Sequence, residues 1–236
     1  MNIDLWVLEL TGLSQRNAAE LQRDLSKDEL ERTAGYLFEP DRGRFAVGRG
    51  ILRHILANYT GLRPERIRFT SSPSGKPVLQ EQKLHFSVSH AGTLYAVAVS
   101  LSCAVGLDLE RVSTFPVTDD LLHRVCTRQE RYDLEQLPAP ARRVRFLGLW
   151  TLKESYLKAI GTGLLFSPNR IAAAPKSLNE ESSISKLCLD GRILSGWTAV
   201  GFEPPCAQRT VGTLVAQTDL PLEIIYRNPG ELFSAQ

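Results

Sequence analysis

The sequence predicts an α+β fold of two lobes, because strand-like and helix-like patterns occur in both halves of the chain. Its 236 residues are enough for one large domain or two small ones with a real hydrophobic core. The pattern divides near residues 101–104, and no low-complexity linker lies there. We therefore expect an N-terminal lobe at residues 1–103 and a C-terminal lobe at residues 104–236, each with an antiparallel sheet and packed helices.

The N-terminal half begins with a strand and continues with helices. Residues 3–10 alternate apolar and polar side chains, as a half-buried strand does. Ser26 precedes a helical run as an N-cap, and Glu29 stands where it completes a capping box. Residues 41–61 carry apolar side chains at helical spacing and end at Gly61, a typical C-cap. Two helices are expected in this region.

Strands return after the turn-forming residues 71–79. Residues 83–90, 93–100 and 104–112 are strand-like and are separated by Gly or Ser. Three such runs in sequence predict an antiparallel meander.

The C-terminal half places helices before strands. Helical patterns cover residues 121–137 and 142–161, and they are separated by the prolines of "PAPA". Strand-like runs follow at residues 186–202, with a hairpin turn at Asp190-Gly191, and at residues 210–217 and 222–227.

Composition narrows the classes of function. The net charge of +2 argues against a nucleic-acid binder, whose surface would be strongly basic. No apolar stretch approaches the roughly 20 residues of a membrane span, and no charged-then-apolar leader follows Met1, so we expect a cytoplasmic protein without membrane contact. The four cysteines never form Cys-x-x-Cys, which indicates reduced thiols rather than a zinc ribbon.

Basic residues concentrate in one segment of the N-terminal half. Glu65 is the only acid between residues 42 and 76, against eight basic residues: Arg42, Arg44, Arg49, Arg53, Arg63, Arg66, Arg68 and Lys76. Such a segment could receive an anionic ligand, or it could be a solvated helix face followed by a basic loop.

Two carboxylates lie on one face of a predicted strand. Asp108 and Glu110 are two residues apart, so their side chains leave the same side about 7 Å from each other. Oxygen ligands of this kind suit Mg²⁺, which takes one or two carboxylates together with substrate phosphates. A solvated sheet edge is the commoner explanation of such a pair.

A second acid lies on the predicted helix at residues 142–161. Glu154 and Lys158 are four residues apart and must share one helix face. An exposed pair at this spacing is ordinary, but Trp150, Leu157 and Ile160 make this a core-facing helix. The pair could therefore reach a cleft between the lobes.

Three further residues could hold a phosphate group. Ser89 and His90 form no Gly-x-Ser-x-Gly nucleophile motif, but hydroxyl and imidazole groups donate hydrogen bonds to phosphate oxygens. The stretch around Lys76 is not a P-loop, because Pro77 stands where Ser or Thr is required. Lys76 could still bind phosphate as a point charge.

The ordered set of motifs "GRFAVGRGILR", "SGKPVL", "FSVSHAG", "VGLDLE" and "WTLKESYLKAIGTGL" closely resembles the 4′-phosphopantetheinyl transferases of the Sfp type. The motifs extend from Arg44 to Leu164. The resemblance implies two pseudo-symmetric lobes in one chain, which we expect to be a monomer. It also implies transfer of the phosphopantetheine arm of coenzyme A to a serine of an apo acyl or peptidyl carrier protein, leaving adenosine 3′,5′-bisphosphate.

The resemblance assigns roles to individual residues. Asp108, Glu110 and Glu154 would surround Mg²⁺, and Lys158 would contact the pyrophosphate or assist the leaving group. The coenzyme A contacts would be Arg44, Arg49, Lys76, Ser89 and His90. Where some members carry lysines, this chain has Glu29 and Arg32, so the adenine end could be held differently. We also expect Glu154 to accept the serine proton, directly or through a metal-bound water.

The carrier protein could dock on residues 114–134, where apolar side chains mix with Arg124 and Arg128. An ordinary amphipathic helix packed on its own lobe explains this pattern equally well. Two other classes of function stay open from the residues: a non-catalytic coenzyme A or nucleotide-binding module, and a metal-dependent pyrophosphate hydrolase.

Overall fold

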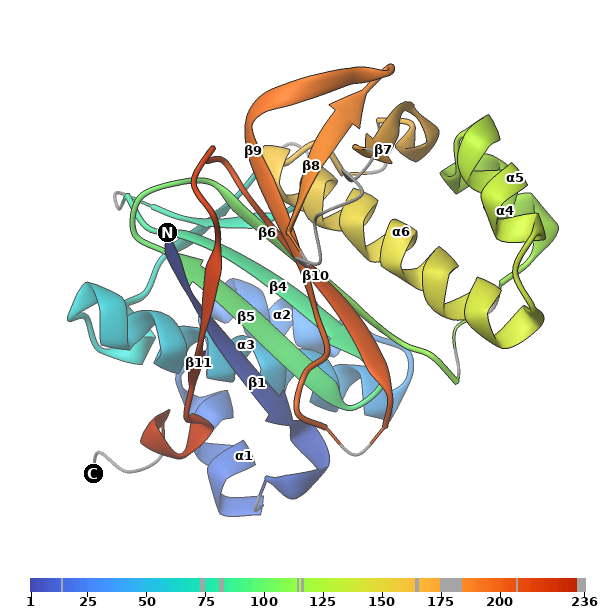
Figure 1. Cartoon of the computed structure of the whole chain (residues 1–236). Coiled ribbons are helices and arrows are strands. Elements are labelled where there is room, and N and C mark those ends of the chain that lie inside the picture. The colour runs from blue at the N-terminus through green and yellow to red at the C-terminus, as the bar shows by residue number, and fades with distance from the viewer. Residues whose placement is uncertain are drawn as a thin grey trace.

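The computed structural model describes residues 1–232 except 14, 73–74, 81–82, 114, 116, 164–165, 175–183 and 207. Two larger sheets and one small hairpin form its strand framework, with helices packed on the sheets (Figure 1). Both halves contain a run of helices and a run of strands, so the predicted α+β class is confirmed.

The first sheet has the order β11-β1-β5-β4. Its strands are β11 (Glu223–Arg227), β1 (Asn2–Glu9), β5 (Leu94–Ser100) and β4 (His85–Ala91). The helices of this half are α1 (Gln15–Arg23), α2 (Lys27–Ala34) and α3 (Glu39–Thr60), with the short 3₁₀ helices η1 (Leu10–Gly12) and η2 (Pro64–Arg66). Apolar side chains of α3, such as Ile51 and Ile55, pack against Trp6 of β1 and Val97 of β5.

The second sheet is wholly antiparallel, in the order β6-β10-β9-β8-β7. Its strands are β6 (Val105–Arg111), β10 (Thr210–Ala216), β9 (Arg192–Phe202), β8 (Ile184–Leu189) and β7 (Ile171–Ala173). Helix α6 (Ala139–Ile160) lies across this sheet, with Leu152, Tyr156 and Leu157 packed against it (Figure 1).

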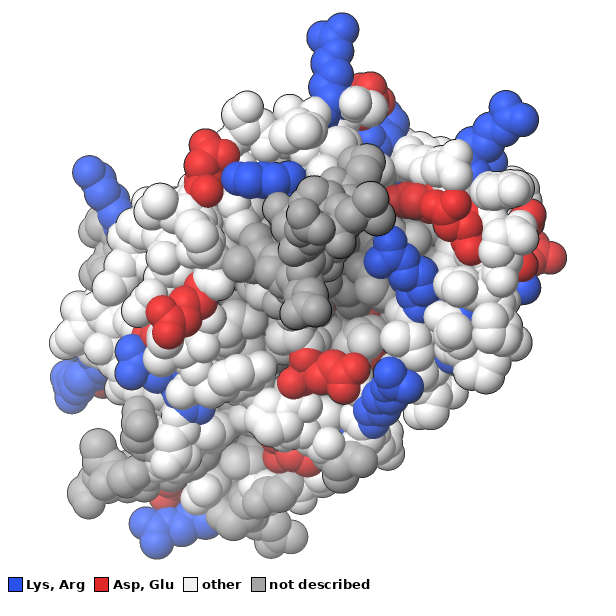
Figure 2. All heavy atoms as spheres, viewed as in Figure 1, with Lys and Arg blue, Asp and Glu red and all other residues white. Residues whose placement is uncertain are grey.

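The remaining elements are short. Helices α4 (Asp119–Val125) and α5 (Arg128–Glu135) lie beside α6, strands β2 (Phe69–Ser71) and β3 (Pro77–Leu79) form the hairpin, and η4 (Pro168–Arg170) and η5 (Pro229–Leu232) are 3₁₀ helices. Basic and acidic side chains are interspersed on the face shown in Figure 2. No helix in the described part of the chain is long and apolar enough to cross a membrane.

The two halves repeat one helix design. Helices α3 and α6 each have 22 residues, each carries proline in its first turn, and each packs on its own sheet. Both end at a left-handed glycine, Gly61 with φ 68° and Gly161 with φ 72°, where a residue without Cβ adopts positive φ at little cost. The predicted C-cap at Gly61 and the Ser26–Glu29 capping box are confirmed.

The predicted three-strand meander is wrong, because β6 leaves the first sheet. It pairs with β10, while β4 pairs only with β5 among the described strands. Serine hydroxyls connect the facing edges of the two sheets: Ser87 Oγ accepts the Leu107 N–H at 3.0 Å, and Ser89 Oγ accepts the Leu109 N–H at 3.3 Å. Side chains thus take the place of a backbone ladder between β4 and β6.

Two other expectations need correction. The helical pattern at residues 121–137 is two helices, because Thr127 caps α5 and forms a capping box with Glu130. The last strand, β11, belongs to the first sheet, where it pairs parallel with β1, although the division at residue 103 assigns it to the second lobe. The first sheet is therefore mixed rather than wholly antiparallel. The hairpin turn at Asp190-Gly191 is confirmed, with φ of 50° and 78°.

Candidate active site

Three elements bring predicted site residues together where the two sheets meet. Strand β6 supplies Asp108, β4 supplies Ser89, and the last turn of α6 supplies Lys158. One carboxylate oxygen, Asp108 Oδ1, accepts a hydrogen bond from Ser89 Oγ at 2.9 Å and another from Lys158 Nζ at 2.7 Å. Asp108 is only 5% exposed, so these two donors replace water in compensating its negative charge.

Glu110 and Glu154 complete an acidic cluster around Asp108. Burial, then the charge of Asp108, raises the pKa of Glu110 to about 7, against a weaker opposing hydrogen bond from Trp150. Burial and Asp108 also raise the pKa of Glu154, while Lys158 opposes the shift. The charge of Asp108 therefore disfavours the ionised forms of both Glu110 and Glu154.

The donor set of this cluster fits a hard divalent cation. Asp108 Oδ2 and Glu154 Oε1 are buried and have no hydrogen-bond partner, which leaves two negative oxygens uncompensated. Carboxylate oxygens are the ligands that Mg²⁺ prefers. The described residues do not, however, gather three such side chains into a ready-made metal site. At Asp108 Oδ1 the positive charge comes from the ammonium group of Lys158, which forms an ion pair with this oxygen.

A cavity of about 570 Å³ opens onto Asp108 and Lys158 from the side of α3. Ser89 and His90 line it from β4, and Arg44 and Arg49 line it from α3. Burial, then the charges of Lys158 and Arg44, lowers the pKa of His90, so its imidazole is neutral at pH 7. Four predicted ligand contacts thus share one cavity with Asp108 and Lys158, whereas Glu110 and Glu154 do not line it.

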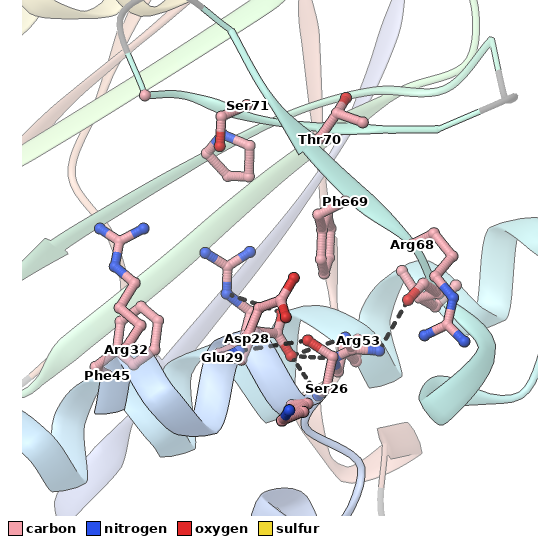
Figure 3. A pocket seen from close by; sticks show the side chains of 15 residues that line it. Ser26, Asp28, Glu29, Arg32, Phe45, Arg53, Arg68, Phe69, Thr70 and Ser71 are labelled. Atoms are coloured by element: carbon pink, nitrogen blue, oxygen red, sulfur yellow. Dashed lines mark hydrogen bonds and ion pairs between the residues drawn. The ribbon is translucent and has the colours of Figure 1, made fainter. Parts of the chain in front are cut away.

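A second cavity, of about 530 Å³, lies next to the first, and Phe45, Arg49 and Pro77 line both. Figure 3 shows Phe69 projecting from β2 into this space, and Arg32 beside Phe45. We call this space the basic pocket. Its basic lining residues are Lys27, Arg32, Arg49, Arg53 and Arg68, and its acidic ones are Asp28 and Glu29.

Glu29 joins two arginines at the floor of the basic pocket (Figure 3). Arg53, 1% exposed, bonds Glu29 Oε2 at 2.7 Å and also donates to the carbonyls of Pro64 and Ile67, so it is satisfied within the protein. Arg49 lies 3.5 Å from Glu29 and stacks on the ring of Phe69 at 4.8 Å. One acid thus faces two cations, and the pocket keeps a positive excess.

Lys76 is not brought to these two cavities. Its ammonium group donates to the carbonyl oxygens of Lys158 and Val105, at 2.6 and 3.1 Å. Burial, then the charge of Lys158, lowers its pKa to about 8. The side chain lines a smaller cavity of about 270 Å³, beside Val105 and Gly161.

Sequence reasoning missed the aromatic walls of both cavities. Phe45 and Phe69 line the basic pocket, and Tyr36 and Tyr95 line the larger cavity. Phe45 stands inside the motif "GRFAVGRG", beside two arginines, and this is the only signal that could have marked it.

The predicted docking segment is fixed to α6 by a buried lysine. Lys153, 0% exposed, forms an ion pair with Glu130 of α5 and donates to the carbonyl of Val125 at 2.7 Å. Arg124 and Arg128 are exposed on α4 and α5. Residues 114 and 116 of the segment lie outside the described residues.

Two family models match consecutive parts of the chain. The one described as 4′-phosphopantetheinyl transferase, N-terminal, matches residues 14–102, and the one described as 4′-phosphopantetheinyl transferase superfamily matches residues 104–207.

Individual proteins match as well. The 4′-phosphopantetheinyl transferase HetI of Nostoc sp. is 36% identical over 166 residues, 69% of this chain and 70% of that protein. A phosphopantetheinyl transferase of Thraustochytrium sp. is 31% identical over 206 residues, 80% of this chain and 70% of that protein. A solved holo-(acyl-carrier-protein) synthase from Bacillus anthracis is 18% identical with a TM-score of 0.39, covering 50% of this chain and 98% of that one.

Proposed function

The chain belongs to the 4′-phosphopantetheinyl transferases of the Sfp type, and from this premise we propose its substrates and mechanism. It transfers the arm of coenzyme A to a serine of an apo acyl or peptidyl carrier protein and releases adenosine 3′,5′-bisphosphate. The observation that carries the proposal is the junction of Asp108, Ser89 and Lys158 at the end of a cavity with basic walls.

The two adjoining cavities suit the two anionic parts of coenzyme A. The pyrophosphate lies in the larger cavity, where Lys158 and His90 face it as donors and Ser89 holds Asp108 in place. The adenosine 3′-phosphate lies toward the basic pocket, where Arg49 and Arg32 supply positive charge and Phe45 and Phe69 supply aromatic surface. This division explains why the basic residues lie in the N-terminal half and the carboxylates in the C-terminal half.

In this proposal Asp108, Glu110 and Glu154 are the residues that would hold Mg²⁺. The bound cation would neutralise charge on the pyrophosphate and on the cluster itself. Two observations support this assignment: burial and the charge of Asp108 raise the pKa values of Glu110 and Glu154, and two buried carboxylate oxygens have no hydrogen-bond partner.

The transfer step uses groups that the chain itself provides. The carrier serine Oγ forms a bond to the β-phosphorus, and the bond from that phosphorus to the bridging oxygen breaks with release of adenosine 3′,5′-bisphosphate. Glu154 accepts the serine proton, because it lies on α6 beside Asp108, one helical turn before Lys158. Lys158 stabilises negative charge on the pyrophosphate oxygens.

The test is the intact mass of a purified apo carrier protein after incubation with this chain, coenzyme A and Mg²⁺, with an EDTA control. The proposal predicts a gain equal to one phosphopantetheinyl group, which EDTA prevents. No gain while coenzyme A binds would indicate a binding module. Free phosphopantetheine without carrier modification would indicate a hydrolase.

A further inference from the structure

Lys76 joins the N-terminal hairpin to the C-terminal half of the molecule. It directly precedes Pro77, the first residue of β3, which is the second strand of the hairpin. Its ammonium group reaches across to the carbonyls of Lys158 and Val105. Its neighbours Gly75 and Pro77 line the basic pocket, but Lys76 does not.

The two acceptor carbonyls belong to the elements that carry the acidic cluster. Lys158 lies in the last turn of α6, where backbone carbonyls lack intrahelical partners and a cation is favoured. Val105 is the first residue of β6 and lies three residues before Asp108. One ammonium group therefore bridges the end of α6 and the start of β6.

The backbone of Lys76 is itself fixed in the hairpin. Its carbonyl accepts the Ser72 N–H at 2.8 Å, and its N–H donates to Ser72 Oγ at 3.1 Å. The same hairpin provides Phe69, Thr70 and Pro77 to the wall of the basic pocket. The wall of the ligand pocket and the last turn of α6 are thus connected through a single side chain.

We propose that Lys76 is a positioning residue, which sets Lys158 against the β2–β3 hairpin through the Lys158 carbonyl and does not contact the ligand. The inference rests on the proposed coenzyme A transfer. The Lys158 ammonium lies 2.7 Å from Asp108, so a movement of the last turn of α6 displaces it from the reacting phosphates. A displacement of about 1 Å in such a site costs about 10- to 100-fold in rate.

A double-mutant cycle tests the coupling. The turnover number kcat with coenzyme A and a carrier protein is measured for the wild type, Lys76→Met, Lys158→Ala and the double variant. Methionine keeps the apolar length of lysine but donates no hydrogen bond. We expect Lys76→Met to lower kcat by about 10- to 100-fold, and the Lys158→Ala loss to be clearly smaller in the Lys76→Met background. The matched control is Lys83→Met, at an exposed lysine. It should leave kcat of the wild type unchanged, and it should leave the loss caused by Lys158→Ala unchanged.

Three results would overturn the inference. Independent, additive losses would make Lys76 a general stabilising residue. A raised KM for coenzyme A with kcat intact would place its ammonium group on the ligand. Unchanged kinetics in Lys76→Met would remove the role altogether. If Lys76→Met fails to fold, as judged by circular dichroism, the same cycle with Lys76→Gln decides between these outcomes. A wild type without transferase activity would instead contradict the proposed function.

Discussion

The two carboxylate oxygens of Asp108 lie in different surroundings. One oxygen accepts hydrogen bonds from Ser89 and Lys158, while the other is buried without a partner beside two more acids. In the absence of a cation the folded state therefore carries electrostatic repulsion. Such repulsion makes the stability of the free protein sensitive to pH and to divalent ions.

Removing the charge of Glu110 should stabilise the metal-free protein at high pH. Its pKa rises from 4.5 to about 7 on folding, because of burial and the charge of Asp108. Above pH 7 the folded state bears the full cost of the ionised carboxylate, and the cost disappears as pH falls from 7 to 4.5 because the folded state takes up the proton.

We therefore expect Glu110→Gln to raise stability in EDTA at pH 8 by about 1 kcal/mol, or ~2 to 4 °C in Tm, after allowance for solvent screening. The gain should shrink at pH 5. Thermal denaturation followed by circular dichroism measures both values. A Tm difference that is the same at the two pH values would contradict the assignment.

Glu154→Gln should reduce turnover much more than ligand binding. Loss of a general base costs about 100- to 10,000-fold in rate, whereas the coenzyme A contacts lie on other residues. Steady-state kinetics gives kcat, and isothermal titration calorimetry with Mg²⁺ gives the Kd of coenzyme A. Equal losses in both would argue against a proton-accepting role for Glu154.

Among the elements, α5 is held to α6 by Lys153, which has no exposure to solvent. Lys153 directly precedes Glu154 and has a structural role. It fixes the pair α4–α5 near the active site. Arg124 and Arg128 project from this pair into solvent. These two exposed arginines suit the acidic carrier protein of the proposed reaction.

Charge reversal on this surface tests carrier docking. Arg124→Glu and Arg128→Glu should each raise the KM for the carrier protein by about 5- to 10-fold and leave the KM for coenzyme A unchanged, because like charges repel the partner. Exposed Arg192→Glu, on the β8–β9 hairpin, is the control. Unchanged carrier kinetics in both variants would remove α4 and α5 from the docking surface.

The sequence predicts the individual strands and long helices well, because their periodicity is local. It does not predict which strands pair. β6 resembles the third strand of a meander, but Gly106 lets it approach α6 so closely that a Cβ would lie 1.8 Å from the Ser155 carbonyl oxygen. β11 pairs with β1 across almost the whole chain, a contact that no local pattern encodes.

The same distinction applies to the candidate site. Spacing predicts only that Asp108 shares a strand face with Glu110 and that Lys158 shares a helix face with Glu154. The family resemblance assigns Asp108 and Lys158 to the site, and the structure brings the two into contact. Lys76 stands in a motif that resembles a ligand loop, yet its flexible stem reaches backbone carbonyls instead. The direction of a long side chain depends on tertiary packing, which spacing in the sequence cannot give.

At the scale of the whole molecule, the two halves share one hydrophobic cluster. Ile3 and Leu5 of β1 belong to the same cluster as Leu107 of β6 and Leu214 of β10. β11 also completes the first sheet from the far end of the chain. The two halves therefore depend on each other for stability.

A fragment of residues 1–103 should consequently fail to fold alone. It would lack β11 and would expose the apolar face that packs against β6. Circular dichroism and amide proton dispersion should show an unfolded or molten chain, and co-expression with residues 104–236 should recover a folded complex. A cooperative thermal transition of the isolated fragment would contradict this dependence.

The pairing of β1 with β11 also fixes an order of events during biosynthesis. The ribosome makes β1 long before its parallel neighbour β11, so one edge of β1 has no native partner while the intervening elements are synthesised. Unpaired strand edges favour aggregation. A nascent chain thus cannot complete its first sheet until β11 has emerged from the ribosome, and a product that terminates before β11 leaves that edge of β1 unpaired.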